Sequence, residues 1–184
     1  MKKIIALVLT LALLLSCAAA LAEAEKESMG ILKVNKAFNI EYNAMPEGYL
    51  LDIQQQNDMT IIANIRSSSR NDLPRMSLII AFNDEWADTE RLNDISEEDM
   101  EAIKDSFFVE YSDLAFEIKE TSQGTQLLVV TAPSGQDAYI YTIYMGHEIE
   151  VHIFPGTEQE ELTDADVDRV VTFLSDMDFV PVEQ

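Results

Sequence analysis

The acidic run Asp164-Ala165-Asp166-Val167-Asp168 has the alternating aspartates that open a calcium-binding loop of the EF-hand type. Such a loop also needs glycine at its sixth position and an acidic residue at its twelfth, but these positions hold Arg169 and Ser175. Aspartate is also favoured in the first turn of a helix, where it interacts with the helix dipole. We therefore interpret the run as a helix start and predict neither a metal site nor a bound cofactor.

The two histidines, His147 and His152, are the next candidates for metal binding or acid–base chemistry. Both lie in a segment with strand-like alternation, where residues five positions apart point to opposite faces. We therefore expect that they do not bind one metal ion together. His152 shares a face with Glu148 and Glu150, which we interpret as a polar patch on a strand. The chain contains no HExxH, GxSxG, GxxxxGK or GxGxxG motif.

Paired carboxylates are a further source of chemistry, because two of them can act as the acid and base of a hydrolase. With 34 acidic residues, the sequence contains many such pairs and identifies no catalytic one. A small extracytoplasmic hydrolase is therefore an alternative hypothesis with no catalytic residue assigned. Tyr139, Tyr141 and Tyr144 are suited to a ligand groove, but their alternation on an apolar strand favours packing in the core.

The chain has a formal net charge of −22 at pH 7. This charge disfavours binding to nucleic acid or to an anionic membrane surface, because both would repel it. It is compatible with a role in solubility alone or with recognition of a cationic protein partner. We predict contact with such a partner at acids outside the two predicted helices. They are Glu158, Glu160 and Glu161, followed by Asp84, Glu85 and Asp88.

The first residues have the pattern of a bacterial secretory signal: two lysines precede an apolar run, 4–15, too short to span a bilayer comfortably. Two processing sites compete after this run. Ala20-Leu21-Ala22 is a small-x-small site that would make Glu23 the first residue. Leu14-Leu15-Ser16-Cys17 resembles a lipobox, in which the cysteine is acylated. We favour cleavage after Ala22, because the apolar residues after the cysteine are typical of the end of a signal peptide.

The expected signal peptide is therefore 1–22, and the mature protein is expected to be secreted. The alternative is a lipid anchor through Cys17 on the outer face of the cytoplasmic membrane. No later stretch is long and apolar enough to span a membrane. Because Cys17 is the only cysteine, neither route leaves a free thiol or a disulfide in the processed chain.

The rest of the sequence alternates strand-like segments with two helical ones. After a flexible lead-in, 23–36, we predict a single α+β domain, 37–184. Ser96 and Thr163 are predicted to cap its two helices. The predicted strands are 38–42, 48–55, 59–66, 76–82, 114–120, 125–132, 137–144 and 148–154. They would form an antiparallel sheet of about six to eight strands covered by helices.

Two of these strands carry specific expectations about position. Segment 137–144 is apolar on both faces, which predicts a strand in the middle of a sheet covered on both sides. Segment 148–154 alternates Ile149, Val151 and Ile153 with polar residues, which predicts a position nearer an edge or one wetter face.

The run Phe38-Asn39-Ile40-Glu41-Tyr42, followed by Pro46-Glu47-Gly48-Tyr49, resembles the opening of PsbP-like domains. The resemblance covers about residues 37–181, and Tyr49 stands where a tryptophan is common. It implies an α/β/α sandwich and a non-enzymatic binding or accessory role, with no shared catalytic residues. We therefore expect a secreted module of a bacterial cell envelope that engages another protein through its acidic surface or a sheet edge.

Overall fold

The computed structural model describes residues 30–34, 36–42, 48–107, 113–121 and 123–182. Several residues singled out above lie outside this part of the chain. They are the signal peptide 1–22, the cleavage residues Ala20, Ala22 and Glu23, the lipidation candidate Cys17, and Pro46 and Glu47 of the PsbP-like opening. No described helix is long and apolar enough to cross a membrane.

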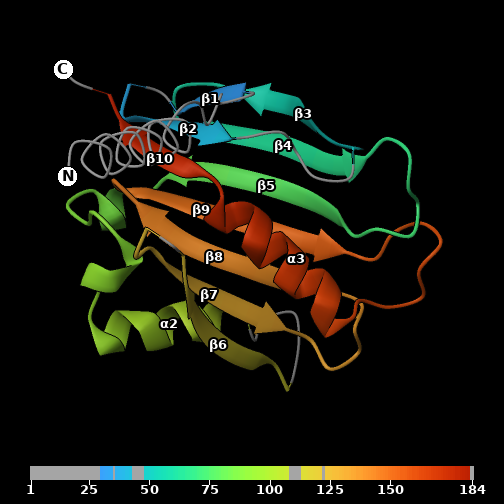
Figure 1. Cartoon of the computed structure of the whole chain (residues 1–184). Coiled ribbons are helices and arrows are strands. Elements are labelled where there is room, and N and C mark those ends of the chain that lie inside the picture. Colours follow the sequence, from blue (N-terminus) through green and yellow to red (C-terminus); the bar gives the residue numbers. More distant parts are fainter. Residues whose placement is uncertain (1–29, 35, 43–47, 108–112, 122, 183–184) are drawn as a thin grey trace, which may run out of the picture.

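A seven-stranded sheet in the order β3-β4-β5-β9-β8-β7-β6 forms the centre of the molecule (Figure 1). Each of its strand pairs is antiparallel. Two meanders build it, and they meet where β5 pairs with β9. The strands are β3 (Tyr49–Gln56), β4 (Thr60–Ser67), β5 (Arg75–Phe82), β6 (Ala115–Glu120), β7 (Gln126–Thr131), β8 (Ala138–Tyr144) and β9 (His147–Phe154). The predicted α+β class with a mainly antiparallel sheet is confirmed.

A second, three-stranded sheet joins the two ends of the described chain in the order β1-β2-β10. Only β2 (Phe38–Tyr42) was among the predicted strands. β1 (Gly30–Val34) lies within the predicted flexible lead-in, 23–36, which is therefore wrong for these residues. Leu32 and Val34 of β1 are buried, and this burial holds the strand in place. β10 (Asp178–Pro181) follows the last helix and pairs with β2.

The two helices begin where their capping residues predict. In α2 (Glu97–Phe107), the backbone N–H of Asp99 donates to Ser96 Oγ at 3.1 Å. In α3 (Asp164–Ser175), Thr163 and Asp166 form a reciprocal capping box. The connector before α2 contains two short 3₁₀ turns, η2 (Asp84–Trp86) and η3 (Leu92–Asp94).

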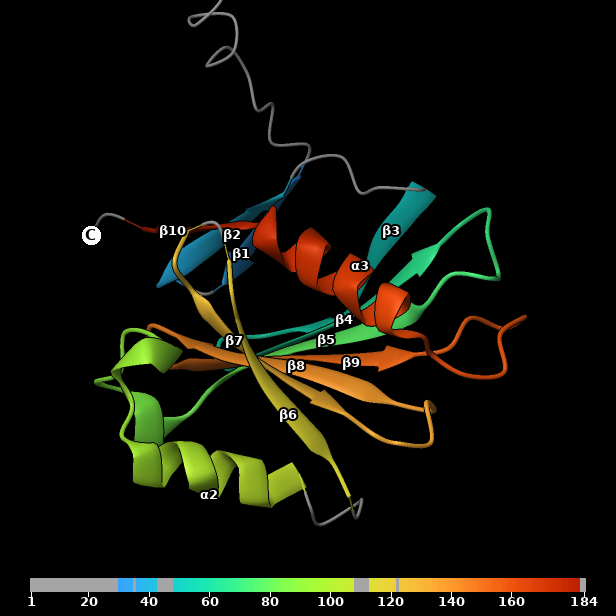
Figure 2. The same cartoon turned by 60° about the horizontal axis from the view of Figure 1, so that its bottom comes forward.

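The two faces of the large sheet are packed differently. One face lies in a large core cluster that includes Val170 and Phe173 of α3 and Leu32 of the small sheet. On the other face, only residues of β6, β7 and β8 take part in a second core cluster. This cluster also includes Ile103 of α2 and Trp86 of η2. Figure 2 shows α3 and α2 on opposite sides of the sheet.

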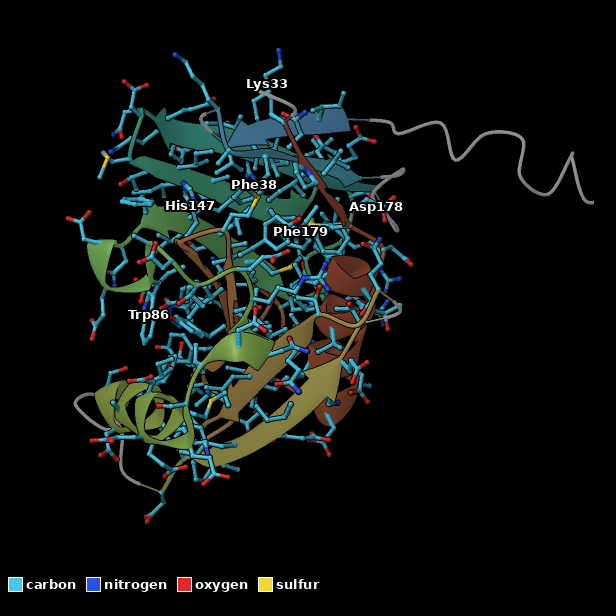
Figure 3. The ribbon with its side chains drawn as sticks, turned by 90° about the vertical axis from the view of Figure 1, so that its left-hand side faces the viewer. Lys33, Phe38, Trp86, His147, Asp178 and Phe179 are labelled. Carbon is cyan, nitrogen blue, oxygen red and sulfur yellow. The ribbon has the colours of Figure 1, made fainter. Side chains whose placement is uncertain are left out.

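Aromatic side chains join the small sheet to the large one, beside the aliphatic residues Leu32, Val34 and Ile40. Phe38 is fully buried, and its ring centroid lies 4.9 Å from that of Tyr144 and 5.3 Å from that of His147. The ring centroid of Phe179 on β10 lies 6.0 Å from that of Phe38, and Phe179 packs against the large core cluster. Figure 3 shows Phe38 between His147 and Phe179. These contacts hold β2 and β10 against β8 and β9.

The strand with two apolar faces, β8, is buried along its whole length, as predicted. β9 is not an edge strand, because it lies between β5 and β8 in the middle of the sheet. The prediction of an edge position was therefore wrong, whereas the alternative of one wetter face is correct: Glu148, Glu150 and His152 are half-buried while the alternate residues are buried. A central strand tolerates this polar face because no described helix covers it there.

Candidate functional site

Among the described residues, no helix covers one half of one face of the large sheet. The cluster beneath α2 contains no residue of β3, β4, β5 or β9. The side chains of these four strands that point to the α2 side are half-buried or exposed. We call this surface the open half-face. In contrast, the other side of β4, β5 and β9 is buried at alternate residues in the large core cluster.

The register of the strands orders the open half-face into rows. Ile62, Ile79 and Glu150 lie side by side on β4, β5 and β9. The next row toward the β4–β5 loop contains Asn64, Ser77 and His152. The last row contains Arg75 opposite Phe154, with Arg66 on the neighbouring strand. The face therefore combines an apolar pair beside Glu150, a polar row and an end with two arginines.

Local turn chemistry sets the register of the first hairpin. Asn57 Oδ1 accepts hydrogen bonds from the backbone N–H of Met59 at 2.8 Å and of Thr60 at 2.9 Å. Such a turn by an asparagine side chain closes the chain reversal between β3 and β4. Because a slip of one residue would move every side chain to the opposite face, this turn keeps Asn64 and Arg66 on the open half-face.

His152 is held firmly at the boundary between the open and covered halves. Its Nε2 lies 2.9 Å from Asp137 Oδ1. Its ring stacks on Tyr139 with centroids 4.1 Å apart and contacts Phe154 with centroids 3.8 Å apart. His147 lies on the opposite face, 5.3 Å from Phe82, so the prediction that the two histidines face opposite sides is confirmed.

Ser77, His152 and Asp137 have the residue types of a nucleophilic triad. They also lie in a row, since Ser77 is the cross-strand neighbour of His152 and His152 contacts Asp137. The hydrogen-bond geometry does not support that chemistry. No hydrogen bond joins Ser77 to His152 in the described residues. Moreover, β5 is paired on both sides, so its backbone N–H groups are used by the sheet and cannot form an oxyanion hole.

A groove of about 450 Å³ lies at the cationic end of the open half-face. Its lining includes Asp52, Asn64, Arg66, Arg75 and Phe154. The Arg75 Nε–H donates to the Pro155 carbonyl at 3.0 Å, and the guanidinium carbon lies 6.0 Å from the Phe154 ring centroid. This volume is within the range of ligand pockets.

Glu148 connects the open half-face to the covered half. Its Oε1 accepts hydrogen bonds from Trp86 Nε1–H at 3.0 Å and from the Tyr141 hydroxyl at 2.8 Å. Burial raises the pKa of Tyr141 well above its usual value, and the Glu148 carboxylate raises it further. The tyrosine is therefore a hydrogen-bond donor at every physiological pH. Figure 3 shows Trp86 on the η2 segment beside this part of the sheet.

The acids predicted as partner contacts are exposed but do not form one surface. Asp84, Glu85 and Asp88 follow the end of β5, whereas Glu158, Glu160 and Glu161 follow the end of β9. Because β5 and β9 are antiparallel and eight residues long, these two groups lie at opposite ends of the sheet, roughly 25 Å apart along the strands. Glu158 also accepts a hydrogen bond from the Asn71 side chain at 3.1 Å.

The remaining candidate residues have structural explanations. Tyr139, Tyr141 and Tyr144 are buried in the two core clusters, as the alternation predicted. Asp166 takes part in the capping box of α3, and Asp168 forms an ion pair with Lys119 at 2.5 Å. In the part of the chain that the structure describes, no three His, Cys, Asp or Glu residues are grouped so that they could hold a metal ion.

The sequence did not single out Arg66 or Arg75. They lie in predicted strand 59–66 and in the loop before strand 76–82, and only the strand register brings them together. The signal that could have found them is the scarcity of basic residues in so acidic a chain. No family model matches the chain, and no curated protein matches it.

Proposed function

We propose that the protein is a secreted, non-enzymatic binding or accessory module of a bacterial cell envelope that recognises another protein through the open half-face. The observation that carries the proposal is the uncovered half of an otherwise packed sheet. Ile62 and Ile79 lie side by side at its centre, where no described helix covers them, and Glu150 is their neighbour on β9. Half-buried apolar residues with polar neighbours are typical of protein interfaces.

The partner we propose presents an apolar surface with a carboxylate at one end. The apolar part would cover Ile62, Ile79 and Phe154, and the carboxylate would lie near Arg66 and Arg75. The acidic residues elsewhere would keep the protein soluble and would speed association with any cationic part of the partner.

The proposed location and family have separate support. The apolar run 4–15 and the Ala20-Leu21-Ala22 site support export, with the lipobox at Cys17 as the alternative. The proposed PsbP-like sandwich rests on the resemblance of the run 38–49, and the antiparallel α+β fold is compatible with it. The binding role that this resemblance implies agrees with the proposal.

The proposal is tested by capture with matched variants. The purified exported protein is immobilised and incubated with envelope and culture-supernatant proteins, and the bound proteins are quantified by mass spectrometry. Ile79→Lys places a charge at the centre of the open half-face. Ile53→Lys, at a residue 44% exposed on the opposite face, is the matched control.

We expect one captured protein to be lost with Ile79→Lys and retained with Ile53→Lys. In the complex with that protein, β5 and β9 should gain protection from hydrogen exchange. Retention with Ile79→Lys would contradict the assignment of the open half-face. Loss only when Glu158, Glu160 and Glu161 are replaced by Gln would assign recognition to the acidic surface instead, and the absence of any specific capture would contradict a binding role.

A further inference from the structure

Two exposed arginines share the groove at one end of the open half-face. Arg70, Lys104 and Lys119 each form an ion pair with a nearby acid. Arg66 and Arg75 are exposed and form no ion pair with a described residue. Among the described residues, Lys33, Lys36 and Arg91 likewise form no ion pair. Arg66 and Arg75 differ from them in lying together in the groove of the open half-face, whose only acidic lining residue in the described chain is Asp52.

The strand register places the two charges close together. Ile65 pairs with Met76, and continuing this register by one residue puts Arg66 opposite Arg75. Like charges directly opposite each other on neighbouring strands are destabilising. An anion bound between them would remove this repulsion, so the arrangement favours a ligand over an empty groove.

Several hydrogen-bond donors around the groove have no partner among the described residues and could bind an anion. Arg75 uses its Nε–H on the Pro155 carbonyl and lies against the Phe154 ring, so its two terminal nitrogens have no partner among the described residues. Asn64 and Ser77 lie in the next row and make no side-chain hydrogen bond within the described chain. Guanidinium groups bind carboxylates with two parallel hydrogen bonds, so this donor set suits a carboxylate.

The charge around the groove limits which anion fits. Asp52 also lines the groove, where it accepts a hydrogen bond from the Gln54 amide at 2.8 Å. Its negative charge favours a monoanion over a dianionic phosphate. A polyanion would extend beyond the roughly 8 Å over which two local charges act and would meet the acidic remainder of the surface.

We infer that the groove between Arg66 and Arg75 binds a single carboxylate attached to an apolar body. The guanidinium groups hold the carboxylate, and Phe154 with the apolar pair of the open half-face contacts the rest. This inference rests on the proposed function, because the groove is the end of the same surface. We assign the carboxylate to a side chain of the partner protein, and a free acid is the alternative outcome of the test.

The test uses two pairs of probes that differ only in the carboxylate. One pair is 4-methylpentanoate and its amide, and the other is N-acetyl-Leu-Glu-Leu-amide and its Gln counterpart. Binding to the purified exported protein is followed by NMR chemical shifts. The variants are Arg66→Gln and Arg75→Gln, and Lys104→Gln on α2 is the control with the same change in net charge.

We expect the carboxylate of at least one pair to bind about tenfold or more tightly than its amide, which corresponds to one charge-assisted hydrogen bond. This preference should disappear in both arginine variants and persist in Lys104→Gln. A preference for the peptide over the free acid would assign the carboxylate to a partner protein, and the reverse would assign it to a small molecule.

Equal binding of acid and amide would overturn the inference, as would a preference that survives in either arginine variant or falls equally in Lys104→Gln. If the amide probes still shift the signals of Ser77 and Ile79, the open half-face remains a binding surface and only the carboxylate site fails. If neither probe shifts these signals and capture is insensitive to Ile79→Lys, the proposed function fails as well.

Discussion

The hydrogen bonds to Glu148 are expected to hold the η2 segment against the sheet, and Glu148→Ala tests this. The carboxylate accepts from Trp86 at 3.0 Å and from Tyr141 at 2.8 Å. Both donors belong to side chains that are less than a tenth exposed, so they cannot easily turn to water. A hydrogen bond to a charged group contributes about 1.5–3 kcal/mol, and Glu148 itself is half-buried. We therefore expect Glu148→Ala to lower the free energy of unfolding by about 2–4 kcal/mol.

The assay is urea denaturation followed by the fluorescence of Trp86, the only tryptophan in the chain. Glu148→Gln keeps an acceptor oxygen and should cost only about 1 kcal/mol, and Glu160→Ala on the exposed loop should change the free energy by less than about 0.5 kcal/mol. Adding Tyr141→Phe to Glu148→Ala should cost less than the sum of the two single changes. Strict additivity, or an equal loss with Gln and Ala, would refute the role of this acceptor.

Three further predictions concern pH, the aromatic junction and processing. Burial raises the pKa of Tyr141 and Tyr144 in the folded state, so the unfolded chain loses these protons first. The contribution of the two tyrosines to the free energy of unfolding should be fully present below about pH 10. Above that pH, the free energy of unfolding should fall by up to about 1.4 kcal/mol per pH unit for each tyrosine. Urea midpoints between pH 8 and about 11 measure this, and an unchanged slope in Tyr141→Phe would contradict the assignment. Phe38→Ala should cost about 3–5 kcal/mol in the same denaturation assay, because it removes the fully buried ring between the two sheets, whereas Phe38→Leu should cost much less. The intact mass of the exported protein should correspond to a start at Glu23 and should be the same when Cys17 is replaced by Ala; the mass of a diacylglyceryl cysteine start would contradict this.

The elements that the sequence predicted correctly are those with local signals. Ser96 and Thr163 mark helix starts, and the all-apolar segment 137–144 marks a strand buried on both faces. Each signal depends on contacts within a few residues, so sequence patterns detect it. The turn after β8 also depends on a local residue preference, because Gly146 has a φ of 75°, which glycine adopts without strain.

What the sequence could not show depends on contacts between distant segments. The alternation in β9 is the same for an edge strand and for a central strand with an open face, and only its pairing with both β5 and β8 decides between them. β1 and β10 are short, and neither is a strand without β2. The candidate site has the same limitation, because Arg66 and Arg75 are separated by a loop and become neighbours only through the register.

The pairing of β10 with β2 has a consequence for the order of folding. The central strand of the small sheet lies near the start of the described chain, and one of its two partners is among the last described residues. Contacts so distant in sequence form late, because closing a long loop costs entropy before any contact compensates for it. A chain crossing a membrane from its N-terminus therefore cannot complete the small sheet until β10 has emerged. The polypeptide would therefore remain incompletely folded during translocation and would complete its fold only after crossing the membrane, which is compatible with the export that we propose.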